Sequence, residues 1–170
     1  METYNFSPNL TNFVSKHSAL LKNVEIISVL IFVIGIIMHF MAIKNADIVV
    51  EIGSVLTAIT YWLLAFKIVE VEDIEVSGNL NSSGSIRFIY KLTFIAYFLL
   101  YIAFATQILN SHLSEILLFV TGATLIFMLI ISLLTKGIDR SKIYNFSYYL
   151  RLISALILLL VLFNIHFELF

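Results

Sequence analysis

Histidine and carboxylate residues recur in this sequence at the points where long apolar runs begin or end. His39 closes the first run, and Asp47 and Glu51 open the second, one helical turn apart on one face. Histidine titrates near neutral pH, and histidine together with carboxylates suits proton transfer or the binding of zinc and similar metals. The candidates for a proton or ion pathway at one membrane face are Glu51, Asp47, His39, His112, Glu115 and His166.

Helix capping is the simpler interpretation of this cluster, and it is the one we expect. Polar side chains gather at helix ends because water begins there, and acids in a first turn offset the helix dipole. Glu51 is an exception to the capping interpretation. It is expected to lie below the interface, where an ionised side chain usually pairs with another group or has a functional role. A proton or ion site, and after it a divalent-metal site, are the alternatives. No HExxH or other metal motif is present, and we predict neither a metal nor a cofactor.

The elements that position these residues are membrane spans. The chain has 170 residues, of which 61% are hydrophobic and 12% charged, whereas a soluble domain carries about 25% charged residues. Apolar runs long enough to cross a hydrocarbon layer of roughly 30 Å recur along it. We therefore predict an all-α integral membrane protein. The net charge of −1 gives no bulk attraction to nucleic acid, and the absence of cysteine excludes disulfides and thiolate chemistry.

Five transmembrane helices are expected, arranged as two antiparallel hairpins plus a fifth helix. The links after the first and third spans are short, and short links force antiparallel neighbours. Arg151, inside the fifth span, is expected to extend to the headgroups. In the loop after the second span, the alternation of residues 69–76 permits a small strand. The chain is a single domain with spans at 24–43, 47–67, 88–109, 113–135 and 146–167, and a cytoplasmic loop at 68–87.

The basic residues predict the orientation. Nine of the ten Lys and Arg lie on the side of the N-terminus and of the loops after the second and fourth spans, and Lys44 alone lies on the other side. The positive-inside rule then places the N-terminus in the cytoplasm and the C-terminus outside, in the inner membrane of a bacterium. The stretch METYNFSPNL lacks the basic region and cleavage site of a signal peptide, so we expect the first span to be retained. A short interfacial helix is predicted before it, with one apolar face formed by Leu10, Phe13, Val14 and Leu21.

Two glycines and a row of aromatic residues predict how the helices pack. Gly53 and Gly122 occupy similar positions in the two hairpins, and small residues let helix backbones approach closely in lipid. Aromatic residues with 4-3-4-3 spacing follow the third span, which predicts a heptad seam against a neighbouring helix. A quinone or lipid groove is the alternative use of this seam. Its members are Tyr90, Phe94, Tyr97, Tyr101 and Phe104.

The first hairpin also carries a recognisable arrangement of residues. Met38-His39-Phe40 ends its first helix, and its second helix opens with a glycine and closes on aromatic residues, with Gly53, Ala58, Tyr61, Trp62, Leu63, Ala65 and Phe66. This hairpin resembles the two-span stator subunit of the gliding-motility and type 9 secretion motor of Bacteroidota, and related multi-span proteins of that phylum. Thr57 stands where the stator subunit has an intramembrane carboxylate. The resemblance therefore implies a shared hairpin architecture rather than motor function.

The predicted function is that of a non-enzymatic polytopic membrane subunit, which serves as a scaffold, anchor or assembly component of a larger membrane complex. No catalytic triad order, phosphate-binding loop or Walker pattern is present. The expected partners are the lipid bilayer and further copies of the chain or other membrane subunits, without nucleic acid. The alternative is a small ion- or proton-conducting protein that uses the outer-face cluster. A membrane-embedded enzyme and a membrane effector or sensor are further alternatives.

Overall fold

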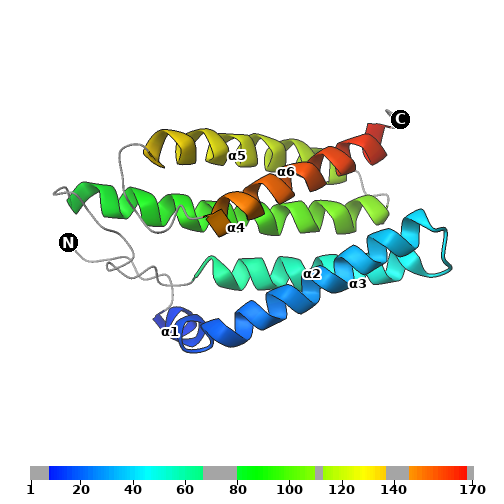
Figure 1. The fold of residues 1–170 in the computed structure, drawn as a ribbon, viewed down its shortest axis with the longest axis horizontal. Helices are drawn as coiled ribbons and strands as arrows, with labels where there is room; N and C mark the ends of the chain where they lie inside the picture. Colours follow the sequence, from blue (N-terminus) through cyan, green and yellow to red (C-terminus); the bar gives the residue numbers. More distant parts are fainter. Residues whose placement is uncertain (1–7, 67–79, 110–112, 137–145, 168–170) are drawn as a thin grey trace.

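Every regular element in the described part of the chain is an α-helix. The computed structural model describes residues 8–66, 80–109, 113–136 and 146–167. Its helices are α1 Pro8–Lys16, α2 Ser18–Phe40, α3 Ala46–Leu64, α4 Leu80–Ile108, α5 Leu113–Lys136 and α6 Phe146–Phe167 (Figure 1). Within these described residues, four apolar segments are long enough to cross a membrane, namely Ser18–Phe40, Ala46–Leu64, Phe88–Ile108 and Leu113–Leu134. The prediction of an all-helical chain with several apolar segments of membrane-spanning length is confirmed.

The helices form one elongated bundle with two distinct ends. α2 and α3 lie side by side and are joined at residues 41–45, where Asn45 adopts the left-handed conformation that asparagine tolerates. α4 packs on α3 and on α5, and α6 packs on α5 and α4. In Figure 1, α2 and α6 start at about the same level and run to the same end of the bundle. We call this the turn end, because residues 41–45 lie there, and we call the opposite one the α1 end.

The contact between α2 and α3 is a close backbone approach. A Cβ atom on Gly53 would lie 2.5 Å from the Phe32 Cα atom, and one on Gly35 would lie 2.7 Å from the Val50 backbone nitrogen. Each helix thus contributes one glycine at the point where the other helix passes closest. Without a hydrophobic drive between helices in lipid, such close packing is a main source of their association. Gly122 is used differently, because it faces Leu159 and Phe163 of α6 rather than α4, its own hairpin partner.

The aromatic residues of α4 form the centre of the bundle. Phe94, Tyr97, Tyr101 and Phe104 are buried, and Tyr90 is half-buried. The rings of Tyr97 and Tyr101 lie 5.1 and 5.6 Å from the ring of Tyr61 on α3. On the other side, the Phe32 ring contacts Tyr101 and Phe104 edge-on at 5.0 and 5.1 Å. This seam therefore joins α4 to both helices of the first hairpin.

The helices extend beyond the predicted spans at the α1 end. α2 begins at Ser18, and α4 begins at Leu80, within the predicted loop 68–87. A helix needs backbone hydrogen bonds and not apolar side chains, so it continues where the apolar run stops. The predicted strand at 69–76 lies outside the described residues. Of the predicted interfacial face, Val14 and Leu21 are buried against the bundle, whereas Phe13 is exposed.

Candidate functional site

His39 and Asp47 meet at the turn end. The His39 Nδ1 atom lies 2.7 Å from the Asp47 Oδ1 atom, and the two side chains are 53% and 64% exposed. A polar contact this open to solvent contributes little to stability, because water competes for it and two side chains must be ordered. The arrangement places a histidine at the end of α2 against an acid in the first turn of α3.

A cavity of about 530 Å³ lies beside this pair, between α2, α3, α4 and α6. Its polar lining consists of His39, Asp47, Gln107 and His166, and its other walls are apolar. The His166 Nδ1 atom lies 2.8 Å from the Gln107 Oε1 atom, so this ring nitrogen donates to the amide oxygen. The cavity thus holds two histidines from different halves of the chain, each bonded to a different polar neighbour.

The remaining members of the predicted cluster do not join this cavity. Glu51 is half-buried on α3 and Glu115 is exposed at the start of α5, and neither lines it. His112 lies outside the described residues. Among the residues that the structure describes, no three His, Asp or Glu side chains converge as a metal site would require. The structure therefore pairs His39 with Asp47, places His166 elsewhere on the lining of the same cavity, and leaves Glu51 and Glu115 outside it.

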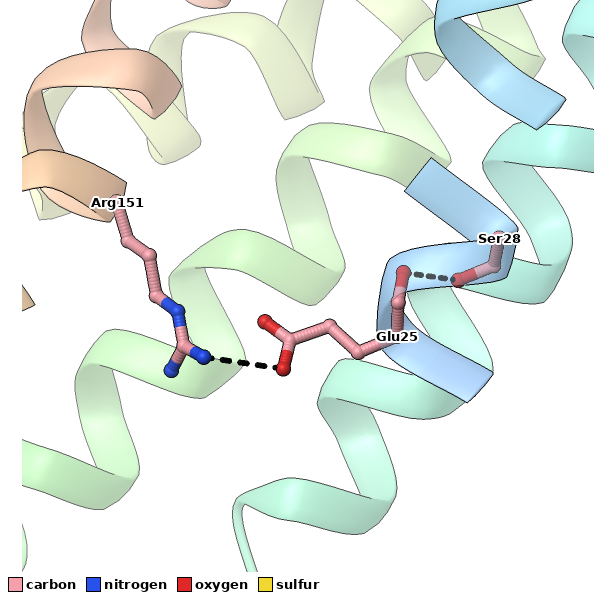
Figure 2. A network of polar contacts seen from close by, with 3 residues as sticks. All are labelled: Glu25, Ser28 and Arg151. Atoms are coloured by element: carbon pink, nitrogen blue, oxygen red, sulfur yellow. Dashed lines mark hydrogen bonds and ion pairs between the residues drawn. The ribbon is translucent and has the colours of Figure 1, made fainter. Parts of the chain in front are cut away.

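The second polar site, near the α1 end, is built around an ion pair between distant helices. The Arg151 Nη2 atom of α6 donates to the Glu25 Oε2 atom of α2 over 3.1 Å. Figure 2 shows the two side chains extending toward one another from their helices, with α4 behind them in this view. The Glu25 side chain is 8% exposed and that of Arg151 34%. Arg151 thus pairs with a buried carboxylate of α2, and its extension to the headgroups stays a prediction.

Three tyrosines from α3 and α4 lie on the same side of the bundle as this ion pair. The Tyr61 hydroxyl interacts with the Glu25 carboxylate, and Tyr97 and Tyr101 line the same space as Glu25 and Arg151. Tyr97 is 3% exposed, and among the described residues its hydroxyl has no hydrogen-bond partner. A buried hydroxyl without a partner is costly, so this atom is suited to a group that the chain itself does not supply.

The ion pair and the tyrosines line a groove between α2 and α6. The groove encloses about 610 Å³, and a smaller cavity of about 200 Å³ adjoins it at the α1 end. Lys22, Glu25 and Arg151 line both, so the ion pair stands between the two spaces. Because α2 packs mainly on α3, and α6 on α5 and α4, direct helix packing does not close the groove from the side.

The spacing of residues in α2 indicates that Glu25 is buried and paired, which the length of the apolar run alone does not show. The buried residues of α2 follow a 4-3-4-3 spacing, and Glu25 lies within this row: Leu21, Glu25, Ser28, Phe32 and Gly35. A carboxylate on the buried face of a span indicates a partner. Gly35 was also missed, although it is the one glycine of α2. No comparable signal marks Gln107, whose role depends on the position of α6.

Comparison with known protein families, with characterised proteins and with solved structures finds no match to this chain. The class of protein therefore rests on the fold itself. An all-helical bundle with four apolar helices of membrane-spanning length fits a multi-pass membrane protein. The resemblance to the motor stator subunit stays a prediction.

Proposed function

We propose that the chain is a non-enzymatic multi-pass subunit of a larger assembly in the inner membrane of a bacterium. In this proposal α6 is a fifth span, the α1 end is cytoplasmic and the turn end is outside. The length of α6 supports the fifth span, because 22 residues extend about 33 Å as a helix. Its apolar segment, Tyr148–Asn164, is shorter than those of the four other candidate spans. The excess of Lys and Arg on one side of the chain supports the orientation.

The observation that carries the subunit proposal is the uneven burial of the four candidate spans. The segments of α3 and α4 are the most buried inside the bundle, whereas those of α2 and α5 are the least. α2 and α5 therefore present wide apolar faces, with exposed residues such as Ile27, Ile34, Phe119 and Phe127. Such faces suit lipid or the helices of another membrane chain. Within the bundle, most described Ser and Thr hydroxyls donate to carbonyls of their own helix, as those of Thr57, Thr60 and Thr106 do.

The proposal predicts that other protein chains copurify with this one when it is extracted from its own membrane. After extraction in mild detergent, a native mass spectrum is expected to show the chain bound to larger, different chains, whose identities would reveal the process it serves. A monomer in every mild detergent would contradict the subunit proposal.

A second candidate, a small proton- or ion-conducting protein, is favoured by the cavity at the turn end. Two histidines line its walls, and a ring of identical chains could align such cavities. A closed homo-oligomer in the native mass spectrum would favour this candidate. This candidate also predicts proton flux into proteoliposomes that contain the protein. Flux no greater than that of protein-free vesicles would remove it.

The orientation and the fifth span predict a specific pattern of chemical labelling. Because the chain has no cysteine, single cysteines can be introduced as Lys16→Cys, as Lys44→Cys, or after Phe170. A membrane-impermeant maleimide applied to intact spheroplasts is expected to label the cysteine at position 44 and the one at the C-terminus. The cysteine at position 16 is expected to react only after permeabilisation. A C-terminal cysteine that behaves like the one at position 16 would exclude α6 as a span.

A further inference from the structure

The groove between α2 and α6 has a polar end and an apolar end. Lys22, Glu25 and Arg151 lie at the polar end, and Tyr61, Tyr97 and Tyr101 also line the groove. Toward the turn end its walls become aliphatic, formed by residues such as Val29, Val33, Ile157 and Leu158. The shape and chemistry therefore match a molecule with one polar head and a long apolar tail.

The edges of the groove face the surroundings of the bundle. Ile26 and Leu30 on α2 are each more than half exposed, as are Leu150 and Ile157 on α6. In a membrane these side chains meet the hydrocarbon layer, so a tail lying between them stays in an apolar environment. An occupant can thus enter sideways from the bilayer.

The charges at the polar end favour an anionic head. Lys22 and Arg151 carry two positive charges against the single negative charge of Glu25, which leaves an excess of one positive charge beside the groove. The Tyr97 hydroxyl lacks a partner and can donate to an oxygen acceptor. Lys22 is exposed and forms no ion pair with any residue that the structure describes, so its three N–H donors are available at the groove edge.

We propose that this groove binds one anionic phospholipid of the bilayer, with its phosphate near Lys22, Arg151 and the Tyr97 hydroxyl and an acyl chain between α2 and α6. The phosphate supplies the acceptor that Tyr97 lacks and balances the positive charge. Glu25 keeps the Arg151 guanidinium at the level of the groove, and this contact leaves further N–H groups of Arg151 that can donate to the head. The site is formed within one chain and does not require a partner subunit.

The test measures lipid retention by native mass spectrometry. Delipidated protein in mild detergent is titrated with phosphatidylglycerol or with phosphatidylcholine of the same acyl chains. One phosphatidylglycerol is expected to bind about tenfold more tightly than the first phosphatidylcholine, as a charge-assisted contact provides. Equal retention of the two lipids would overturn the proposal, and so would a copurified quinone in the groove in place of phospholipid.

Three variants test lipid binding separately from the stability of the fold, because none of them breaks the ion pair between Glu25 and Arg151. Tyr97→Phe removes only the hydroxyl that has no partner, and Lys22→Gln removes an exposed charge. Each is expected to weaken phosphatidylglycerol binding about threefold to tenfold while thermal stability without lipid stays unchanged. Ser154→Phe fills the groove and is expected to abolish retention of the lipid. Lys91→Gln, which changes an exposed lysine that does not line the groove, is the control. Wild-type binding in the first two variants, or in Ser154→Phe, would refute the site.

Discussion

Replacement of Arg151 by leucine is expected to destabilise the folded chain by about 3–5 kcal/mol. The cause is the partner that remains, because the Glu25 side chain is 8% exposed and would keep a buried charge without its cation. Glu25→Leu is expected to cost less. The guanidinium it leaves behind is already 34% exposed and can turn toward the headgroups on its long stem. Unfolding in detergent, followed by circular dichroism against increasing SDS, measures both changes.

A double variant of Glu25 and Arg151 gives a more specific test of the buried ion pair. With both residues replaced by leucine no charge remains buried, so Glu25→Leu with Arg151→Leu is expected to recover most of the stability that Arg151→Leu alone loses. The thermodynamic cycle of the four proteins gives the coupling directly. Lys91→Leu, at an exposed position of α4, serves as the control and is expected to change stability by less than about 0.5 kcal/mol. A double variant less stable than either single variant would contradict the assignment of Glu25 and Arg151 as a buried pair.

Replacement of Gly53 by alanine is expected to have the second large effect, a loss of about 2–3 kcal/mol or more. The added Cβ atom would lie 2.5 Å from the Phe32 Cα atom and 2.6 Å from its nitrogen. Backbone atoms cannot rotate away as a side chain does, so α2 and α3 would have to separate along their contact. Gly35→Ala meets the Val50 backbone in the same way and is expected to act in the same direction.

Gly122→Ala is the matched control for this prediction. Its nearest neighbour would be the Leu159 Cδ2 atom at 3.3 Å, the end of a flexible side chain. Alanine also improves helix propensity over glycine by up to about 1 kcal/mol. The stability of this variant in the SDS titration is therefore expected to equal or exceed that of the parent protein. Equal gains from Gly53→Ala and Gly122→Ala would show that helix propensity, rather than close approach, governs the α2–α3 contact.

The class of fold was predictable because apolar runs of sufficient length leave few other solutions. Helix ends were less predictable. α2 and α4 continue through polar residues at the α1 end, where the apolar signal stops but backbone hydrogen bonding does not. The aromatic seam of α4 could be read from its spacing, whereas its partners could not. That Phe32 and Tyr61 pack on it depends on how the first hairpin rotates about its own axis.

The two polar sites also differ in how well the sequence predicts them, because one joins residues close in the chain and the other joins residues far apart. His39 and Asp47 are eight residues apart, on either side of a short turn, and the sequence predicts their proximity. Glu25 and Arg151 are separated by 126 residues. From sequence alone a charge near the edge of an apolar run marks the end of a span, because lone charges are expensive in lipid. The partner that makes Glu25 tolerable within the bundle becomes visible only when α6 is placed beside α2.

The sideways opening between α2 and α6 also determines what controls occupancy. A molecule that enters there never passes through water, so it reaches the groove by diffusion in the plane of the membrane. The relevant concentration is its mole fraction in the leaflet at the α1 end, and dilution of the surrounding solution has no influence on it. Binding would then follow changes in the lipid composition of that leaflet.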